Sequence, residues 1–74
     1  MTFEGKTFCF TGTMKWTRRR IEGFTRSRGG YVSHKVTRST DYLVTASPSH
    51  RSAKVAAARR LGVKIVTAAE FFAA

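Results

Sequence analysis

The chain has 74 residues, of which 42% are hydrophobic, with fourteen Lys or Arg against four Asp or Glu and a formal net charge of +10. This length allows one small domain, residues 1–74, and the nine aromatic side chains supply enough apolar surface for a core, which argues against a disordered chain. The single Cys excludes an internal disulfide, and no run approaches the roughly 18 apolar residues of a membrane span.

The one-sided charge indicates a polyanionic partner, which is nucleic acid, an acidic protein segment or an anionic membrane. A surface that only solubilises a protein mixes both signs of charge, so nucleic acid or another phosphate-bearing partner is favoured and no membrane is expected. No apolar run of signal-peptide length follows Met1. We therefore expect an intracellular protein, cytoplasmic and nucleoid-associated in a bacterial or phage-like host and nuclear in a eukaryote.

The segment Thr7–Thr11 reads TFCFT and predicts a short buried strand, closed by Gly12. Cys9 lies between two phenylalanines that offer no charge to stabilise a thiolate. We expect it to be a small core residue rather than a reactive thiol.

Thr17 is a plausible N-cap for a basic amphipathic helix that ends at Gly29-Gly30. Two features of this helix are unfavourable: Gly23 in its interior, and Arg18–Arg20 at the positive end of its dipole. A bound anion at that end would offset the second feature.

The remaining elements follow from apolar runs and turn residues. They are strands at Tyr31–Ser33, Asp41–Thr45 and Val63–Val66, a loop at Ala46–Arg51, a helix capped by Ser52 and ending at Gly62, and a closing helix at Ala68–Ala74 that brings Phe71 and Phe72 to the core. The order β-α-β-β-α-β-α predicts an α/β fold with a mostly parallel sheet covered on both faces.

Six short motifs stand in this order along the chain: GKTFCFTGTM at 5–14, Gly-Gly at 29–30, TDYLV at 40–44, SAK at 52–54, LGVKIV at 61–66 and EFF at 70–72. Together they resemble a BRCT domain, of the branch found in bacterial NAD-dependent DNA ligases and in the large subunit of replication factor C. The resemblance covers about Gly5 to Phe72. It implies a four-stranded parallel sheet in the order 2-1-3-4, flanked by three helices, with the first and third helices on one face and the second on the other.

The resemblance also implies a phosphate site. Family members of this branch hold a phosphate with a Thr-Gly after the first strand, an Arg near the start of the first helix and a Lys at the start of the second. Carried over to this chain, these are Thr11, Gly12 and Lys54, with Arg18 or Arg19 as the fourth residue. Counting back from the glycine pair selects Arg18, and counting forward from Thr11 selects Arg19.

These residue types suit an anion, because a hydroxyl, an unobstructed amide, an ammonium and a guanidinium supply charge-assisted hydrogen bonds. Further basic residues are expected along a DNA backbone: Lys15, Arg20, Arg26, Arg28 and Arg51. Trp16, in the loop before the first helix, either stacks on an exposed base or sugar at a DNA end or covers the edge of the core.

The first hypothesis is a non-catalytic, phosphate-recognising DNA-binding module for 5′-phosphorylated ends or nicks in replication and repair. The first alternative is a protein-interaction module that binds phosphopeptides, with a phosphoprotein or another replication or repair protein as its partner. The second is an architectural domain of a larger DNA ligase or replication protein.

Catalysis is not expected, because the four acidic residues are scattered along the chain and no phosphate-loop or adenylation motif occurs. His34 and His50 are expected to be solvated loop residues, and the chain shows no paired spacing for a metal site. No cofactor is expected. Ser52 is expected to cap a helix rather than act as a nucleophile.

Overall fold

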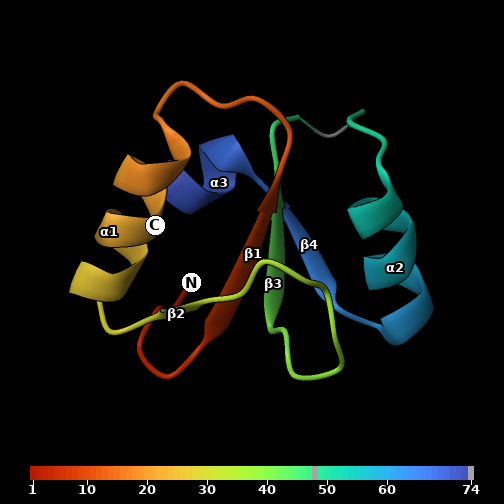
Figure 1. Cartoon of the computed structure of the whole chain (residues 1–74), viewed down its shortest axis with the longest axis horizontal. Coiled ribbons are helices and arrows are strands. Elements are labelled where there is room, and N and C mark those ends of the chain that lie inside the picture. Colours follow the sequence, from red (N-terminus) through yellow and green to blue (C-terminus); the bar gives the residue numbers. More distant parts are fainter. Residues whose placement is uncertain (48, 74) are drawn as a thin grey trace.

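The computed structural model describes residues 1–47 and 49–73 and arranges them around a parallel sheet (Figure 1). The elements in chain order are β1 (Thr7–Thr11), α1 (Arg18–Ser27), β2 (Tyr31–Val32), β3 (Tyr42–Thr45), α2 (Ala53–Leu61), β4 (Lys64–Thr67) and α3 (Ala68–Ala73). This order agrees with the order predicted from the sequence.

The four strands form one sheet in the order β2-β1-β3-β4, and every neighbouring pair is parallel. The central pair, β1 and β3, aligns Phe8 with Tyr42 and Thr11 with Thr45. The order that the family resemblance implies is therefore confirmed.

Helices α1 and α3 cover one face of the sheet and α2 covers the other (Figure 1). Because side chains alternate along a strand, β1 sends Phe8 and Phe10 to the α1/α3 face and Cys9 to the α2 face. Cys9 is fully buried among apolar side chains, as expected of a small core residue.

The core on the α1/α3 face is largely aromatic. Phe71 of α3 is fully buried, and its ring centroid lies 5.0 Å from that of Phe3, 5.6 Å from that of Phe8 and 5.4 Å from that of Phe10. Phe72 is only partly buried and packs at the edge of the same cluster. The short α3 thus contributes the central side chain of the larger core.

The two predicted N-caps and the predicted end of α2 are confirmed. Thr17 Oγ1 accepts the Arg20 amide at 3.2 Å, and Ser52 Oγ accepts the Val55 amide at 3.2 Å. Gly62 follows α2 with φ +74°, a conformation that side-chain-bearing residues rarely adopt.

Three strands differ from the prediction, each by one residue at an end, and β4 differs at both ends. Asp41 precedes β3, because its carboxylate accepts the Thr7 amide at 2.8 Å and holds the chain at the entrance to the sheet. Ser33 lies outside β2, since its hydroxyl donates to Lys35 O and the chain turns there. Val63 still bonds back to Ala58 O at the end of α2, so β4 runs from 64 to 67. Ala74, at the end of the last predicted helix, lies outside the described residues.

Gly23 is exposed inside α1, and a Cβ added there would meet no atom within 4 Å. Because glycine in a helix interior costs about 0.5–1 kcal/mol relative to alanine, we expect Gly23→Ala to raise the free energy of unfolding by about that amount. Urea denaturation measures it. Gly62→Ala is the matched control: its Cβ also has space, but the positive φ should make that variant less stable. A loss of stability in Gly23→Ala would contradict the prediction.

Candidate functional site

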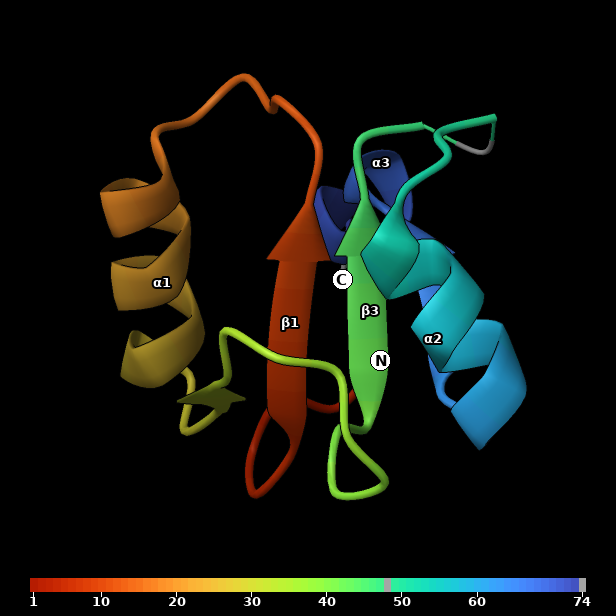
Figure 2. The ribbon, with the colours of Figure 1, turned by 45° about the vertical axis from the view of Figure 1, so that its right-hand side comes forward.

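The loops after β1 and β3 lie at the same edge of the sheet, where the arrowheads of the strands end (Figures 1 and 2). Helices α1 and α2 begin at this edge, so their free amide groups and positive dipole ends lie there. Ligands of open α/β sheets bind at the carboxyl ends of the strands. This edge, which carries Thr11, Gly12, Arg18 and Lys54, is therefore the candidate site.

Two cations share one backbone oxygen at this edge. Arg18 Nη1 donates to Phe10 O at 2.9 Å, and Lys54 Nζ donates to the same oxygen at 3.1 Å. The two charged nitrogens therefore lie within about 6 Å of each other. Since α1 and α2 cover opposite faces, the sheet edge is where side chains from both helices can meet. We call Arg18 and Lys54 the cation pair.

The shared oxygen is available because β2 is short. On the β2 side of β1, Lys6 O accepts the Tyr31 amide and Phe8 O accepts the Ser33 amide. Carbonyls two residues apart along a strand point to the same side, so Phe10 O is the next in this row. The chain turns away after Ser33, and the cation pair takes the place of a strand partner.

The charge of the cation pair is not compensated by carboxylates. The first turns of α1 and α2 contain no acidic residue. Among residues 1–47 and 49–73, the Lys or Arg paired with a carboxylate is Arg26, 3.7 Å from Glu22, and His34 Nε2 lies 3.1 Å from the same carboxylate. Two adjacent cations at two helix N-termini attract an anion.

Thr11 and Gly12 lie beside the cation pair, but the Thr11 hydroxyl is engaged inside the protein. Thr11 is 7% exposed, and its Oγ1 donates to Ser52 Oγ at 3.1 Å. Gly12 has φ +92°, and a Cβ on it would lie 2.8 Å from Ala46 Cβ. The turn after β1 therefore requires glycine, and it leaves the backbone at residue 12 free of a side chain.

Arg18, rather than Arg19, is the arginine whose side chain lies at the carboxyl-edge oxygen. Arg19 follows it in the first turn of α1 and is exposed, with no hydrogen bond to this edge within the described part of the chain. The two residues are successive on a helix, so their side chains point in different directions.

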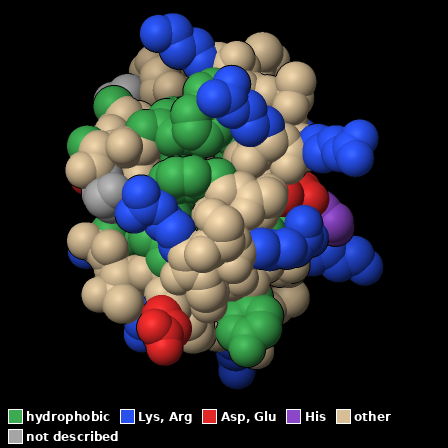
Figure 3. Space-filling view, turned by 90° about the vertical axis from the view of Figure 1, so that its left-hand side faces the viewer, with side chains coloured by type: hydrophobic (Ala, Val, Ile, Leu, Met, Phe, Trp, Pro, Cys, Tyr) green, Lys and Arg blue, Asp and Glu red, His purple; other side chains and the backbone are tan. Residues whose placement is uncertain are grey.

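The five basic residues expected along a DNA backbone are all exposed: Lys15, Arg20, Arg26, Arg28 and Arg51. Two of them lie over aromatic rings: the Arg20 guanidinium is 4.2 Å from the Trp16 ring centroid, and that of Arg28 is 4.6 Å from the ring centroid of Phe24. Figure 3 shows Lys and Arg side chains spread over the α1 side of the molecule, around an area of apolar side chains.

Trp16 covers the edge of the core, which is one of the two roles expected for it. Its ring centroid lies 4.7 Å from that of Phe72 and 5.5 Å from that of Phe24. It remains partly exposed and borders a cavity of about 280 Å³ between the β1–α1 loop and α1.

The sequence interpretation missed His50 as a neighbour of the site. Its Nε2 lies 3.4 Å from Thr11 Oγ1, so His50 is half-buried against β1 rather than freely solvated. Ser52 was expected only as a helix cap, and it also accepts the Thr11 hydroxyl. No spacing in the sequence signals either contact, because both depend on how the β3–α2 loop folds over β1.

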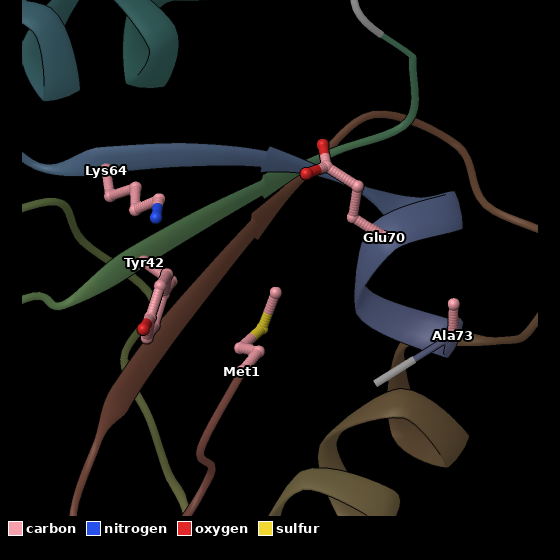
Figure 4. A pocket seen from close by; sticks show the side chains of 5 residues that line it. All are labelled: Met1, Tyr42, Lys64, Glu70 and Ala73. Atoms are coloured by element: carbon pink, nitrogen blue, oxygen red, sulfur yellow. The ribbon is translucent and has the colours of Figure 1, made fainter.

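A larger cavity of about 370 Å³ lies away from the candidate site, along β3, β4 and α3 (Figure 4). Its labelled side chains do not converge on one point. The pKa of Glu70 is lowered because the backbone amide and then the hydroxyl of Thr67 donate to its carboxylate, with a smaller contribution from Lys64. Glu70 thus serves to cap α3.

Within the described ranges 1–47 and 49–73, no three His, Cys, Asp or Glu side chains gather as they would around a metal ion. In the same part of the chain no helix has the length and apolar character needed to cross a membrane.

Comparison with known proteins places the chain in a family. Residues 1–73 match the model of the BRCA1 C Terminus (BRCT) domain. The chain is 38% identical over 72 residues to a DNA ligase of Geotalea uraniireducens (strain Rf4), covering 96% of this chain and 10% of the ligase. It is 42% identical over 66 residues to a DNA ligase of Pseudothermotoga lettingae, covering 88% of this chain and 9% of the ligase. The chain thus spans about a tenth of the length of these relatives.

Two solved structures share the fold. Rad4 BRCT1,2 in complex with a Crb2 phosphopeptide superposes with a TM-score of 0.80 at 24% identity, covering 97% of this chain and 38% of that one. Rad4 BRCT3,4 of S. pombe superposes with a TM-score of 0.82 at 17% identity, covering 96% of this chain and 40% of that one. Sequence motifs, sheet order and family match agree, and the chain belongs to the BRCT domain family.

Proposed function

We propose that this domain is a non-catalytic DNA-binding module that recognises 5′-phosphorylated ends or nicks. The terminal phosphate binds at the cation pair and at the backbone of Thr11-Gly12, and the arginines of α1 lie along the neighbouring duplex backbone.

The observation that carries the proposal is the oxygen shared by Arg18 and Lys54. Two cations without a carboxylate partner, at the start of two helices, form a cradle that a phosphate dianion complements better than a single carbonyl does. A terminal phosphate carries more charge than an internal phosphodiester, so the cation pair favours an end over the middle of a strand.

The total charge supports DNA over a smaller anion. A net charge of +10 exceeds what one phosphate requires, and Arg26 is the one Lys or Arg paired with a carboxylate in the described residues. Unpaired Lys and Arg on the α1 side neutralise several backbone phosphates on binding and release their counterions. The DNA ligase relatives are consistent with a DNA partner.

The second candidate is a module that binds phosphoserine or phosphothreonine peptides. It is favoured by one observation, the phosphopeptide in the complex of Rad4 BRCT1,2, whose fold this chain shares. The same cation pair would hold the peptide phosphate. The surplus positive charge is the argument against it.

Binding measurements with matched ligands test the proposal. A recessed duplex with a 5′-phosphate, the same duplex with a 5′-hydroxyl and a phosphopeptide are titrated at low and physiological salt. We expect the phosphorylated end to bind most tightly at both salts, and both DNA affinities to fall steeply with salt. Equal affinities for the two duplexes would refute end recognition. If the phosphopeptide binds most tightly at physiological salt, the second candidate replaces the first.

A further inference from the structure

The cavity of about 280 Å³ adjoins the cation pair. Its lining includes Gly12, Thr13, Met14, Trp16, Thr17 and Arg18. Arg18 belongs both to the cation pair and to the lining of the cavity. Its Nη1 donates to Phe10 O, while its Nη2 lies 3.4 Å from Gly12 O. A ligand whose phosphate binds at the cation pair can therefore extend into the cavity past Arg18.

The walls of the cavity combine apolar surface with a polar rim. Ile21 is buried with 1% of its surface exposed, while Met14 and Trp16 are partly exposed. Thr13, Thr17 and Arg18 are exposed and supply the rim. This composition suits a group with a flat apolar face and polar edges, and the volume lies just below the range of about 300–1,000 Å³ usual for ligand pockets.

Trp16 is held in a fixed orientation. Its ring contacts Phe24 and Phe72, with centroid distances of 5.5 and 4.7 Å, and the Arg20 guanidinium lies 4.2 Å from its centroid. An aromatic side chain that is already packed loses little conformational freedom when a ligand contacts it. Because the Arg20 guanidinium lies over the ring, a base in the cavity contacts the part of Trp16 that remains exposed, and this apolar contact does not select one base.

On these observations, and resting on the function proposed above, we propose that this cavity is a subsite for the terminal nucleoside that carries the 5′-phosphate. The phosphate lies at Arg18 and Lys54, and the base of the same nucleotide contacts Trp16 and Met14. The domain then recognises the whole terminal nucleotide rather than the phosphate alone, without selecting one base.

Trp16 is the one tryptophan of the chain, so its fluorescence reports on the cavity directly. The protein is titrated with a recessed duplex ending in a 5′-phosphorylated nucleotide, with the same duplex ending in a 5′-phosphorylated abasic residue, and with inorganic phosphate. We expect the complete nucleotide to change the fluorescence most and the abasic end to bind at least about fivefold more weakly, because the apolar contact of the base with Trp16 and Met14 is lost.

The outcomes separate this inference from the proposed function. If both ends bind alike and change the fluorescence alike, while the preference for 5′-phosphate over 5′-hydroxyl persists, the subsite is refuted and the phosphate site stands. If the preference for 5′-phosphate is itself absent, the proposed function fails and the subsite fails with it.

Variants add a second test. Trp16→Phe retains a ring against Phe24 and Phe72 and should reduce the difference in affinity between the complete and the abasic end. Met14→Ala should reduce this difference as well. Tyr31→Ala is the matched control, since Tyr31 is an aromatic residue of β2 with 64% of its surface exposed and does not line the cavity. An equal effect of Tyr31→Ala and Trp16→Phe would overturn the inference.

Discussion

Replacing Lys54 by methionine is expected to raise the Kd for 5′-phosphorylated recessed DNA by about 10- to 100-fold and to leave the Kd for the 5′-hydroxyl duplex nearly unchanged. The reason is the loss of one charge-assisted hydrogen bond, which contributes about 1.5–3 kcal/mol. Methionine keeps most of the length of the side chain without its charge, and Phe10 O still accepts Arg18. Fluorescence anisotropy with both duplexes at one salt concentration measures the effect, with thermal unfolding as a check that the variant folds.

Arg26→Gln is the matched comparison. Arg26 is 58% exposed, pairs with Glu22 and lies in the last turn of α1, away from the cation pair. Loss of the Arg26 charge should reduce the affinity for both duplexes by a similar factor. It should also reduce the slope of log K against log salt by about one. If Lys54→Met reduced the affinity for both duplexes equally, Lys54 would act only as a general cation. End recognition by the cation pair would then be wrong.

Phe71→Ala is expected to remove most of the stability of the domain. Truncating a buried phenylalanine costs about 3–5 kcal/mol, and small domains have a total stability toward the lower end of about 5–15 kcal/mol. Phe71 is fully buried, and its ring contacts those of Phe3, Phe8, Phe10 and Phe24. Urea denaturation followed by circular dichroism should show a much lower midpoint or a chain already unfolded in buffer.

The neighbouring residue provides the control for that prediction. Phe72 belongs to the same helix, carries the same side chain and is only partly buried. Phe72→Ala should therefore lower the free energy of unfolding clearly less than Phe71→Ala does, because less apolar surface returns to water and a smaller cavity remains. Equal losses would mean that α3 as a whole, rather than the buried ring, stabilises the core.

Much of the fold could be predicted because local chemistry and hydrophobic pattern agree. Thr17 and Ser52 cap helices through their own hydroxyls, and Gly62 ends α2 with a positive φ. The strand boundaries were less accurate, since they depend on partners distant in sequence. Asp41 precedes β3 because its carboxylate reaches Thr7, 34 residues away, and no local pattern encodes this contact.

The candidate site shows the same limit. The resemblance to BRCT domains predicted Lys54 as a residue of the site, and the structure places its side chain at the edge of the sheet. The sequence does not decide between Arg18 and Arg19, because both lie in the same helical turn and only the packing of α1 determines which side chain reaches Phe10 O. That oxygen is accessible because β2 has two residues, which is a property of the pairing of β1 and β2 rather than of either segment.

The contact of Arg18 and Lys54 with one oxygen couples the folding of the domain to the binding of an anion. Two like charges held within about 6 Å of each other repel, so folding brings them together at an electrostatic cost that the unfolded chain avoids. An anion between them removes that repulsion and binds the native state alone, which raises the melting temperature in proportion to the logarithm of its concentration once the site is saturated. The domain should therefore be most resistant to heat and to proteases when it is bound to its target.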